Sequence, residues 1–292
     1  MLELIKIKNN TYCFNCNARV GVYKVNEQDV YFIDSSSDSD TAQLLYNAIT
    51  DKGWRLVGII NTHSHADHNG GNAFLQEKTG CKIFANGIEA AITNNTFLNT
   101  VSLIGGYPAH EFTTKLLYAR PSTAYTFDHP DFPKEFEVVN LPGHSADMVG
   151  IRTPDNVLFT ADALVSEKAL DILHLTYIFD IERHLKTLQF LKTLKADIFV
   201  PSHSAQTENI DKLCEKNIAE IFGIRDTLLS FLEKPICFDN LLAKVIEYYK
   251  IRLTNEQYIL VGSTLHCYLS WMKNQGFIDF EIKENTLLWK KV

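Results

Sequence analysis

Three histidines and one aspartate of this chain lie within six residues: His63, His65, Asp67 and His68. Residues two apart in an extended loop point in the same direction, so His63 and His65 can bind one metal ion. A helix that begins after them would direct Asp67 and His68 towards the position of a second metal ion. Gly70 and Gly71 follow and allow the backbone to pack closely there. This spacing predicts a metal site.

One cluster cannot complete two metal sites, so further ligands must come from elsewhere in the chain. The sequence offers three more residues of ligand type, each at the predicted end of an apolar strand: His144 in Leu-Pro-Gly-His, Asp162 in Leu-Phe-Thr-Ala-Asp and His203 in Val-Pro-Ser-His. A polar ligand held by a rigid strand is how preorganised metal sites are built. Alone, each of the three would more often be a structural loop, cap or turn residue. Their order after the histidine cluster favours a shared site.

The elements that must position these residues begin with a sheet. Short strand-like runs separated by Asn, Gly and Ser predict an antiparallel meander over residues 4–7, 19–24 and 29–34. Apolar periodicity predicts a helix over 41–51, and an apolar strand over 54–61 leads into the histidine cluster. A helix over 71–79 and a strand over 81–85 follow. Strands and helices alternate here as in mixed folds.

The middle of the chain combines an irregular insertion with a second set of strands. Residues 87–133 are interrupted by Asn, Gly and Pro, and an insertion beside a site often shapes substrate access. Tyr107, His110 and Tyr177 could line a substrate pocket, although packing or surface roles are commoner. Structural or solvated roles are expected for the histidines outside the ligand set: His110, His129, His174, His184 and His266. The predicted strands are 136–141, 149–153, 157–160 and 197–201, with a turn at 154–156 and a helix over 181–192.

The last eighty residues change to a helical pattern. A long helix is predicted over 211–233, ended by Lys234-Pro235. Three helices over 238–249, 255–260 and 262–275, then a hairpin that turns at Glu284-Asn285, resemble a winged helix. Residues 234–292 hold eight basic and six acidic side chains, and the third helix has one lysine, so nucleic-acid binding is disfavoured. Its apolar residues indicate packing on the rest of the chain or on a second subunit.

Composition narrows the remaining classes of protein. The chain has 292 residues, 46% apolar and 22% charged, with a net charge of −7, which disfavours non-specific polyanion binding. The first residues carry charges within their apolar run, unlike a signal peptide, and no apolar run approaches the roughly 18 residues of a membrane span. We therefore expect a soluble cytoplasmic protein without a membrane partner. Its six cysteines, including the Cys13 and Cys16 pair, are expected to be structural thiols.

The ordered motifs resemble those of the metallo-β-lactamase superfamily over about residues 10–207: His-x-His-x-Asp-His, Pro-Gly-His, an Asp at a strand end and a final His. The resemblance implies an α+β fold, a four-layer αββα sandwich, here with a C-terminal winged helix. It implies that Asp34 is a supporting residue beside the site; Ser36 stands where the family usually has Gly. The implied division is a catalytic domain over 1–210, a connecting helix over 211–233 and a winged-helix-like domain over 234–292.

The resemblance also implies a ligand set and a mechanism. His63, His65 and His144 would hold one metal ion, Asp67, His68 and His203 a second, and Asp162 would bridge both. Two divalent ions about 3.5 to 4 Å apart would share a water, lower its pKa and polarise a carbonyl or phosphoryl oxygen, with Asp67 orienting or deprotonating that water. A ligand set of nitrogen and oxygen without cysteine favours Zn²⁺, with Mn²⁺ or Fe left open.

Three functions remain open. The first is a dinuclear metal-dependent hydrolase of an ester, thioester or lactone of a small cytosolic substrate, with a metal site like that of glyoxalase II. The second is a metal-dependent phosphodiesterase or single-strand endoribonuclease, because a small group of superfamily hydrolases that includes such a nuclease also carries a C-terminal winged helix. The third is a non-catalytic regulatory module, which the intact ligand set opposes. A small-molecule partner is favoured, and a homodimer is left open.

Overall fold

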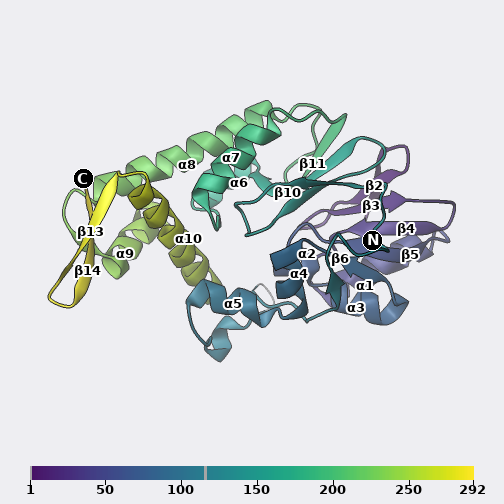
Figure 1. Cartoon of the computed structure of the whole chain (residues 1–292), viewed down its shortest axis with the longest axis horizontal. Coiled ribbons are helices and arrows are strands. Elements are labelled where there is room, and N and C mark those ends of the chain that lie inside the picture. Colours follow the sequence, from purple (N-terminus) through teal and green to yellow (C-terminus); the bar gives the residue numbers. More distant parts are fainter. Residues whose placement is uncertain (1, 115–116) are drawn as a thin grey trace.

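The computed structural model describes residues 2–114 and 117–292 and contains two stacked sheets (Figure 1). The first has seven strands, in the order β1 (Leu4–Lys8), β2 (Thr11–Phe14), β3 (Val20–Lys24), β4 (Asp29–Ile33), β5 (Arg55–Ile60), β6 (Lys82–Phe84) and β7 (Ala124–Tyr125). Its first four strands pair antiparallel, which confirms the predicted meander, and the later pairs are parallel. Sequence patterning missed β2.

The second sheet has four strands, in the order β11 (Ile198–His203), β10 (Val157–Val165), β9 (Val149–Arg152) and β8 (Glu137–Asn140). The strand predicted over 157–160 is longer in the structure, so Asp162 lies inside β10 and not after its end. The pairing with β11 shifts register on both sides of Ala161, which has a φ of 50°. This bulge changes the direction in which the strand presents Asp162.

Helices cover the outer face of each sheet and complete the four layers. The first sheet is covered by α1 (Ser39–Thr50) and α3 (Asn72–Thr79), and the second by α6 (Glu167–Leu173), α7 (Ile181–Leu191) and α8 (Asp211–Phe231). Asp38 and Asp180 cap α1 and α7, each accepting a hydrogen bond from a backbone N–H of the first turn. Buried residues of both sheets pack together between them, among them Ile33, Ile60 and Phe159. The αββα architecture is confirmed.

The insertion over 87–133 folds beside the first sheet. It contains α4 (Gly87–Asn94), α5 (Phe97–Ile104), the 3-10 turn His110–Phe112 and the edge strand β7. The short helix α2 (Ala66–Asn69) precedes it in the chain, directly after the histidine cluster begins. In Figure 1, α5 extends away from the sheet towards the C-terminal part of the chain.

The C-terminal part consists of β12 (Ile236–Cys237), α9 (Phe238–Tyr248), α10 (Asn255–Asn274), β13 (Ile278–Lys283) and β14 (Thr286–Lys291). The predicted hairpin is confirmed, with Glu284 and Asn285 at positive φ in the turn. The prediction of two helices over 255–260 and 262–275 is wrong, because α10 is continuous through Gly262. Tertiary packing of its buried residues, such as Leu265 and Tyr268, outweighs the low helix propensity of that glycine.

Helix α8 connects the second sheet to this C-terminal part. It packs against β10 and α7 and also against α9, and Figure 1 shows it running from the sheet to the far end of the molecule. One continuous apolar cluster includes Leu158 of β10, Leu228 of α8 and Leu265 of α10. The division at 210 and 233 and the winged-helix interpretation remain predictions. No helix in the described ranges has the length and apolar character needed to span a bilayer.

Candidate metal centre

The segment from β5 into α2 presents the histidine cluster as the sequence predicted. His65 is extended, with φ −67° and ψ 148°, and occupies the N-cap position of α2, so that Asp67 and His68 fall on the helix. A Cβ on Gly70 would lie 2.1 Å from the carbonyl oxygen of Ser37, and a Cβ on Gly71 would lie 2.2 Å from that of Ser35. Only glycine fits this close approach.

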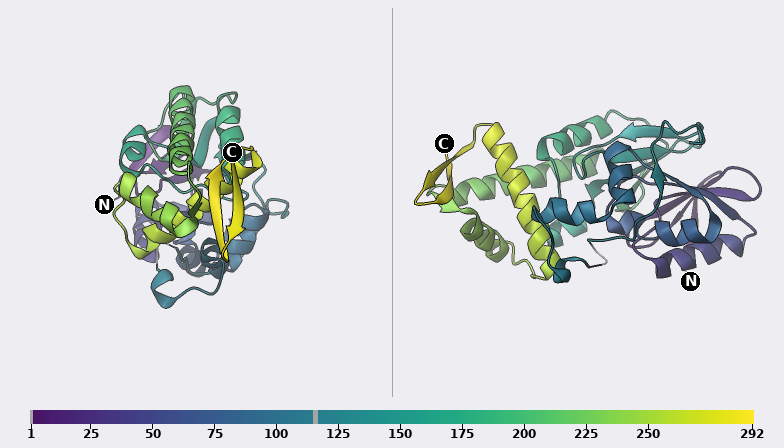
Figure 2. Two further views of the ribbon diagram at one scale, coloured as in Figure 1. Left: turned by 90° about the vertical axis from the view of Figure 1, so that its left-hand side faces the viewer. Right: turned by 60° about the horizontal axis from the view of Figure 1, so that its bottom comes forward.

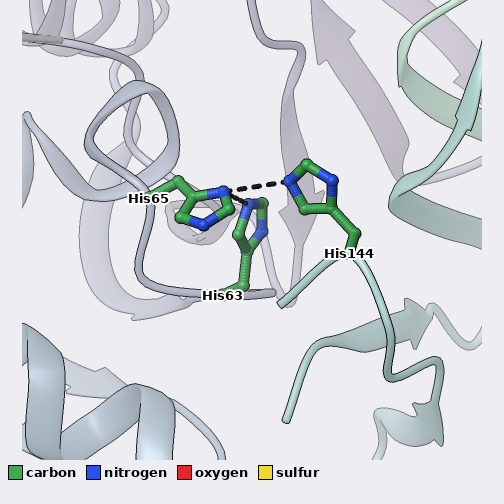
Figure 3. Close-up of side chains that lie close together, drawn as sticks. All are labelled: His63, His65 and His144. Atoms are coloured by element: carbon green, nitrogen blue, oxygen red, sulfur yellow. Dashed lines mark hydrogen bonds between the residues drawn. The ribbon is translucent and has the colours of Figure 1, made fainter. Parts of the chain in front are cut away.

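Three imidazoles converge in a first group, His63, His65 and His144 (Figure 3). Nδ1 of His65 lies 3.0 Å from Nε2 of His63 and 2.9 Å from Nε2 of His144. His144 follows β8 and thus comes from the other sheet. Three nitrogen atoms turned to one point form a site of the kind that binds a divalent ion.

A second group joins two carboxylates to two imidazoles: Asp67, His68, Asp162 and His203. Nε2 of His203 lies 3.3 Å from Oδ2 of Asp67 and 3.3 Å from Oδ2 of Asp162. The same Asp162 oxygen lies 3.4 Å from Nε2 of His144 in the first group. Asp162 therefore lies between the two groups, the position that a bridging ligand requires. All seven candidate ligands come together, and their role as ligands remains a proposal.

Hydrogen bonds at the opposite ring nitrogens fix the orientation of four of these imidazoles. Nδ1 of His68 lies 2.8 Å from Oδ2 of Asp34. Nδ1 of His144 and of His203 lie 3.1 and 3.0 Å from the carbonyl oxygens of Tyr177 and Asn17. In the fourth imidazole, Nδ1 of His63 lies 3.1 Å from the hydroxyl oxygen of Thr62. With Nδ1 bonded outward at each of these rings, Nε2 is directed into the site.

Asp34 lies directly behind the site, as the resemblance implied. Its carboxylate accepts hydrogen bonds from the backbone N–H and hydroxyl of Thr62, both at 2.8 Å, besides its contact with His68. Asp34 and Ser36 have φ values of 65° and 71°. The family usually has Gly at this turn. Here Ser36 adopts the left-handed conformation instead, which costs about 1 to 2 kcal/mol of conformational free energy. Such strain gathers at functional sites.

Burial and charge act differently on the two groups. Burial lowers the pKa of His63 and His65 and lowers that of His144 to about 3, which keeps these rings neutral. In the second group burial opposes charge, but the neighbouring carboxylates outweigh it and raise the pKa of His203 to about 10. The imidazoles likewise hold the pKa of Asp67 at about 2 despite burial. The second group is therefore a compensated set of opposite charges.

Glu89 was missed by sequence reasoning, although it joins the two loops that carry the first group. Its side chain is fully buried on α4. The N–H and hydroxyl of Ser64 donate to Oε2 at 2.9 and 2.5 Å, and the Ser145 hydroxyl and Asp147 N–H donate to Oε1 at 2.7 and 2.9 Å. A glutamate in an amphipathic helix resembles any surface residue, so no sequence signal distinguished it.

A cavity of about 170 Å³ opens on the two groups. Besides ligand candidates it is lined by Asn99 and Leu103 of α5, Leu117, Tyr177 and Leu260 of α10. The insertion therefore does border the site, as expected. Of the three pocket candidates, Tyr177 lines it; Tyr107 and His110 do not and are exposed.

The cysteine pair near this site is not a disulfide. All six cysteines are free thiols. Burial raises the pKa of Cys13 to about 12, and Cys16 donates to the carbonyl oxygens of Phe14 and Ala18. The packing of both side chains agrees with the structural interpretation.

Comparison with known proteins agrees with this fold. The family profile described as Metallo-beta-lactamase superfamily matches residues 15–203, about two thirds of the chain. The chain belongs to the metallo-β-lactamase superfamily.

Two solved structures match over nearly the full chain. A beta-lactamase domain protein from Burkholderia ambifaria has a TM-score of 0.71 at 14% identity and covers 99% of this chain and 94% of its own. A metallo-beta-lactamase family protein from Thermus thermophilus has a TM-score of 0.68 at 16% identity and covers 100% and 98%. A metallo-beta-lactamase from Pontibacter korlensis covers 75% of this chain, with a TM-score of 0.57 at 17% identity and 98% of its own chain covered. These matches show the fold, and the first two extend it to the C-terminal part.

Curated relatives match a shorter region. A hydroxyacylglutathione hydrolase from Rhodopseudomonas palustris strain BisB18 is 31% identical over 137 residues, 45% of this chain and 43% of that protein. One from Methylococcus capsulatus is 44% identical over 46 residues, 16% of this chain and 18% of that protein. The chain thus spans less than half the length of the curated relatives that it matches first.

Proposed function

We propose that the protein is a metal-dependent hydrolase that uses two divalent ions to cleave an ester, thioester or lactone. One observation carries the proposal. Nε2 of His68 and Oδ1 of Asp162 are both buried and lie 3.1 Å apart, within ion-pair distance, yet within the described ranges neither atom makes a hydrogen bond of suitable geometry. A buried polar atom without a partner costs free energy, and a cation between these two atoms would satisfy both.

The donor set fits such ions. The first group offers three imidazole nitrogens, and the second offers two imidazoles and two carboxylates. Nitrogen and oxygen donors without thiolate suit Zn²⁺, and Mn²⁺ or Fe²⁺ also accept them. We propose His63, His65 and His144 for one ion and Asp67, His68 and His203 for the other, with Asp162 bridging.

Bound ions would supply Lewis-acid polarisation of the substrate carbonyl and a water nucleophile at neutral pH. The protein supplies the base: Asp67 is ionised at neutral pH and lines the cavity, where its carboxylate can orient the attacking water and accept its proton. The water oxygen bonds to the acyl carbon and the bond to the leaving group breaks. The leaving thiol or alcohol takes up a proton, and the acid is the second product.

A thioester is the preferred substrate class within this proposal. Its support is the similarity to hydroxyacylglutathione hydrolases, which covers less than half of this chain and of theirs. Fold likeness alone does not choose among esters, thioesters, lactones and phosphodiesters. The substrate panel below therefore contains a phosphodiester and a single-stranded RNA as well.

Metal analysis followed by a substrate panel of thioesters, lactones, a phosphodiester and a single-stranded RNA tests the proposal. The purified protein is expected to hold about two divalent ions, as one for each group of ligands requires. Asp162→Ala should lower thioester hydrolysis by at least about a thousandfold, because it removes the ligand placed between both groups. Asp171→Ala, an exposed aspartate on α6, is the matched control and should retain activity. A folded protein that binds no divalent ion under metal-replete conditions would contradict the proposal.

A further inference from the structure

Two larger cavities meet the small metal-facing cavity at Tyr177. One has about 840 Å³ and shares Leu103 and Tyr177 with it. The other has about 910 Å³ and shares His144, Asp162 and Tyr177 with it, as well as Leu260. Both volumes fall in the range of small-molecule sites. The candidate metal centre thus lies at a junction between two compartments.

The first compartment is apolar and is built by α5, α9 and α10. Figure 2 shows α10 crossing beside α5, and the two helices are in contact. Its lining includes large apolar side chains from these helices and from the 3-10 turn that follows α5: Leu103, Ile104, Phe112, Phe238, Leu242, Ile259 and Trp271. The charged residues of the lining are carboxylates, Asp180 and Glu182, and none of its described residues is a lysine or arginine. An anionic group is therefore repelled from this compartment, while an alkyl chain is favoured.

The second compartment has the opposite charge. Arg19 and Lys168 line it, and the sole carboxylate among its described lining residues is the candidate ligand Asp162. Within the described ranges, neither cation has a carboxylate within ion-pair distance. Asn15, Asn17 and Gln257 add amide groups to the lining. Unpaired cations beside polar amides suit an anionic group such as a carboxylate or a phosphate.

From this asymmetry we propose that the substrate is an amphiphilic thioester: a medium-length alkyl acyl chain lies in the α5/α10 compartment and an anionic thiol moiety in the Arg19/Lys168 compartment. This inference rests on the proposed hydrolase function and names its substrate class. The carbonyl then lies at Tyr177, where the compartments meet. Water adds to this carbon and the C–S bond breaks. The leaving thiol takes up a proton and departs on the basic side, and the acid product is a carboxylate whose alkyl chain occupies the apolar compartment.

Binding of uncleavable analogues tests the inference without turnover. The probes are S-alkyl thioethers of mercaptosuccinate, with alkyl chains of two to eight carbons, titrated calorimetrically into the metal-loaded protein. Affinity should rise about threefold to fourfold for each methylene, the effect of burying one CH2 group. S-alkyl thioethers of thioglycerol, which are neutral, should bind more weakly at every chain length.

Gly262 offers a variant that fills the apolar compartment. It lies on α10 in the compartment lining, and a Cβ there would meet only Leu242, at 3.8 Å. Gly262→Leu should therefore fold and lower the ratio of S-octyl to S-ethyl affinity by at least about tenfold. Gly223→Leu is the matched control: the same change in helix α8, at a position where a Cβ meets nothing within 4 Å. It should leave the ratio unchanged.

Lys168→Gln tests the basic compartment. It should lower the affinity for S-octyl mercaptosuccinate about threefold to fivefold, the size of an exposed ion pair, and leave S-octyl thioglycerol binding unchanged. Lys212→Gln, an exposed lysine on α8 outside the compartment, should change neither. Equal effects of Lys168→Gln on both probes would contradict the placement of the anionic group.

The results separate this inference from the proposed function. Two results would overturn the proposal of an amphiphilic substrate even if S-acetyl mercaptosuccinate is hydrolysed. The first is an affinity that does not depend on alkyl chain length. The second is an equal ratio of S-octyl to S-ethyl affinity in Gly262→Leu and Gly223→Leu. The expected binding pattern without hydrolysis of S-octanoyl mercaptosuccinate supports the two compartments and overturns the hydrolase. If the affinities depend on chain length and charge as expected and the octanoyl thioester is hydrolysed, both the amphiphilic substrate and the hydrolase function are supported.

Discussion

The loops that carry the candidate ligands and the C-terminal helices that cover them are built by different physical means. In the ligand loops, residues 62–69 and 142–147, position is set by hydrogen bonds to buried groups such as Asp34 and Glu89. In the C-terminal cover, α9 and α10, position is set by apolar packing of side chains such as Leu265 and Tyr268. Hydrogen bonds are directional and satisfied by few residue types, whereas apolar contacts accept many.

The contrast between the hydrogen-bonded ligand loops and the apolar cover indicates which part of the molecule can change its substrate specificity. A change of residue type in the ligand loops leaves a buried donor or acceptor unpaired. A change in the cover alters the shape of a cavity and leaves the polar network intact. One superfamily fold can therefore keep its metal centre while the cover is rebuilt for other substrates.

Glu89→Gln is expected to cause the largest loss of stability among near-isosteric changes. Each carboxylate oxygen of Glu89 accepts one backbone N–H, from Ser64 or from Asp147. An amide has one acceptor oxygen, so in either orientation its NH2 group faces a backbone donor. One unpaired donor and the loss of charge-assisted hydrogen bonds should cost about 4 kcal/mol. The affinity for metal should fall about 10- to 100-fold, as for other residues that orient ligands.

Chemical denaturation and metal titration measure these two effects. The matched control is Glu215→Gln, because Glu215 lies on the exposed face of α8 and pairs with Lys192 there. A surface ion pair contributes at most about 1 kcal/mol, so this variant should retain its metal affinity. Glu89→Gln with unchanged metal affinity would show that the hydrogen bonds do not position the loops.

His184, which packs against the ligand loop at Gly143, makes the stability of the protein depend on pH. It lies at the start of α7, and a Cβ on Gly143 would be 2.3 Å from its backbone nitrogen, so no other residue fits between them. Burial lowers the pKa of His184 to about 4, although Asp162 partly opposes this. In the unfolded chain the pKa returns to about 6.5. The unfolded state therefore binds more protons between these values, and stability falls as the pH drops through them.

The expected loss from this histidine is about 3 kcal/mol between pH 6.5 and pH 4 and zero above pH 7. Urea denaturation across this range in the wild type and in His184→Gln measures it, and the variant should show the shallower slope. His110→Gln, at an exposed position, should leave the slope as in the wild type. Identical slopes for all three proteins would mean that His184 does not titrate in this range.

The sequence predicted the candidate ligands well because metal-binding chemistry limits the residue types. His63, His65 and His144, and equally Asp162 and His203, were found from residue type and spacing alone, and the structure brings them together. Asp34 was found through the resemblance and lies where this implied. The extent of β10 was predicted too short, since the bulge at Ala161 carries the chain onward with no turn signal in the sequence.

What the sequence could not give is set by contacts distant in the chain. The amphipathic pattern of α4 does not reveal that Glu89 meets Ser145, because that contact depends on the packing of two sheets. The sequence pattern predicted two separate helices over 255–260 and 262–275, yet burial of the α10 face keeps the helix continuous. The apolar compartment likewise forms where α5 and α10 meet, and neither segment alone predicts a cavity.

Leu265→Met should have the smallest effect and provides the sharpest contrast with Glu89→Gln. Leu265 is fully buried on α10 in the apolar cluster shared with the second sheet. Methionine has a similar volume and flexible bonds, so the free energy of unfolding should fall by less than about 1.5 kcal/mol. Metal affinity should match the wild type, because no hydrogen bond of the ligand loops changes. If Leu265→Met instead weakens metal binding as strongly as Glu89→Gln, apolar packing in the cover also determines the positions of the candidate ligands. The residues of the cover could then not change without altering the candidate metal centre.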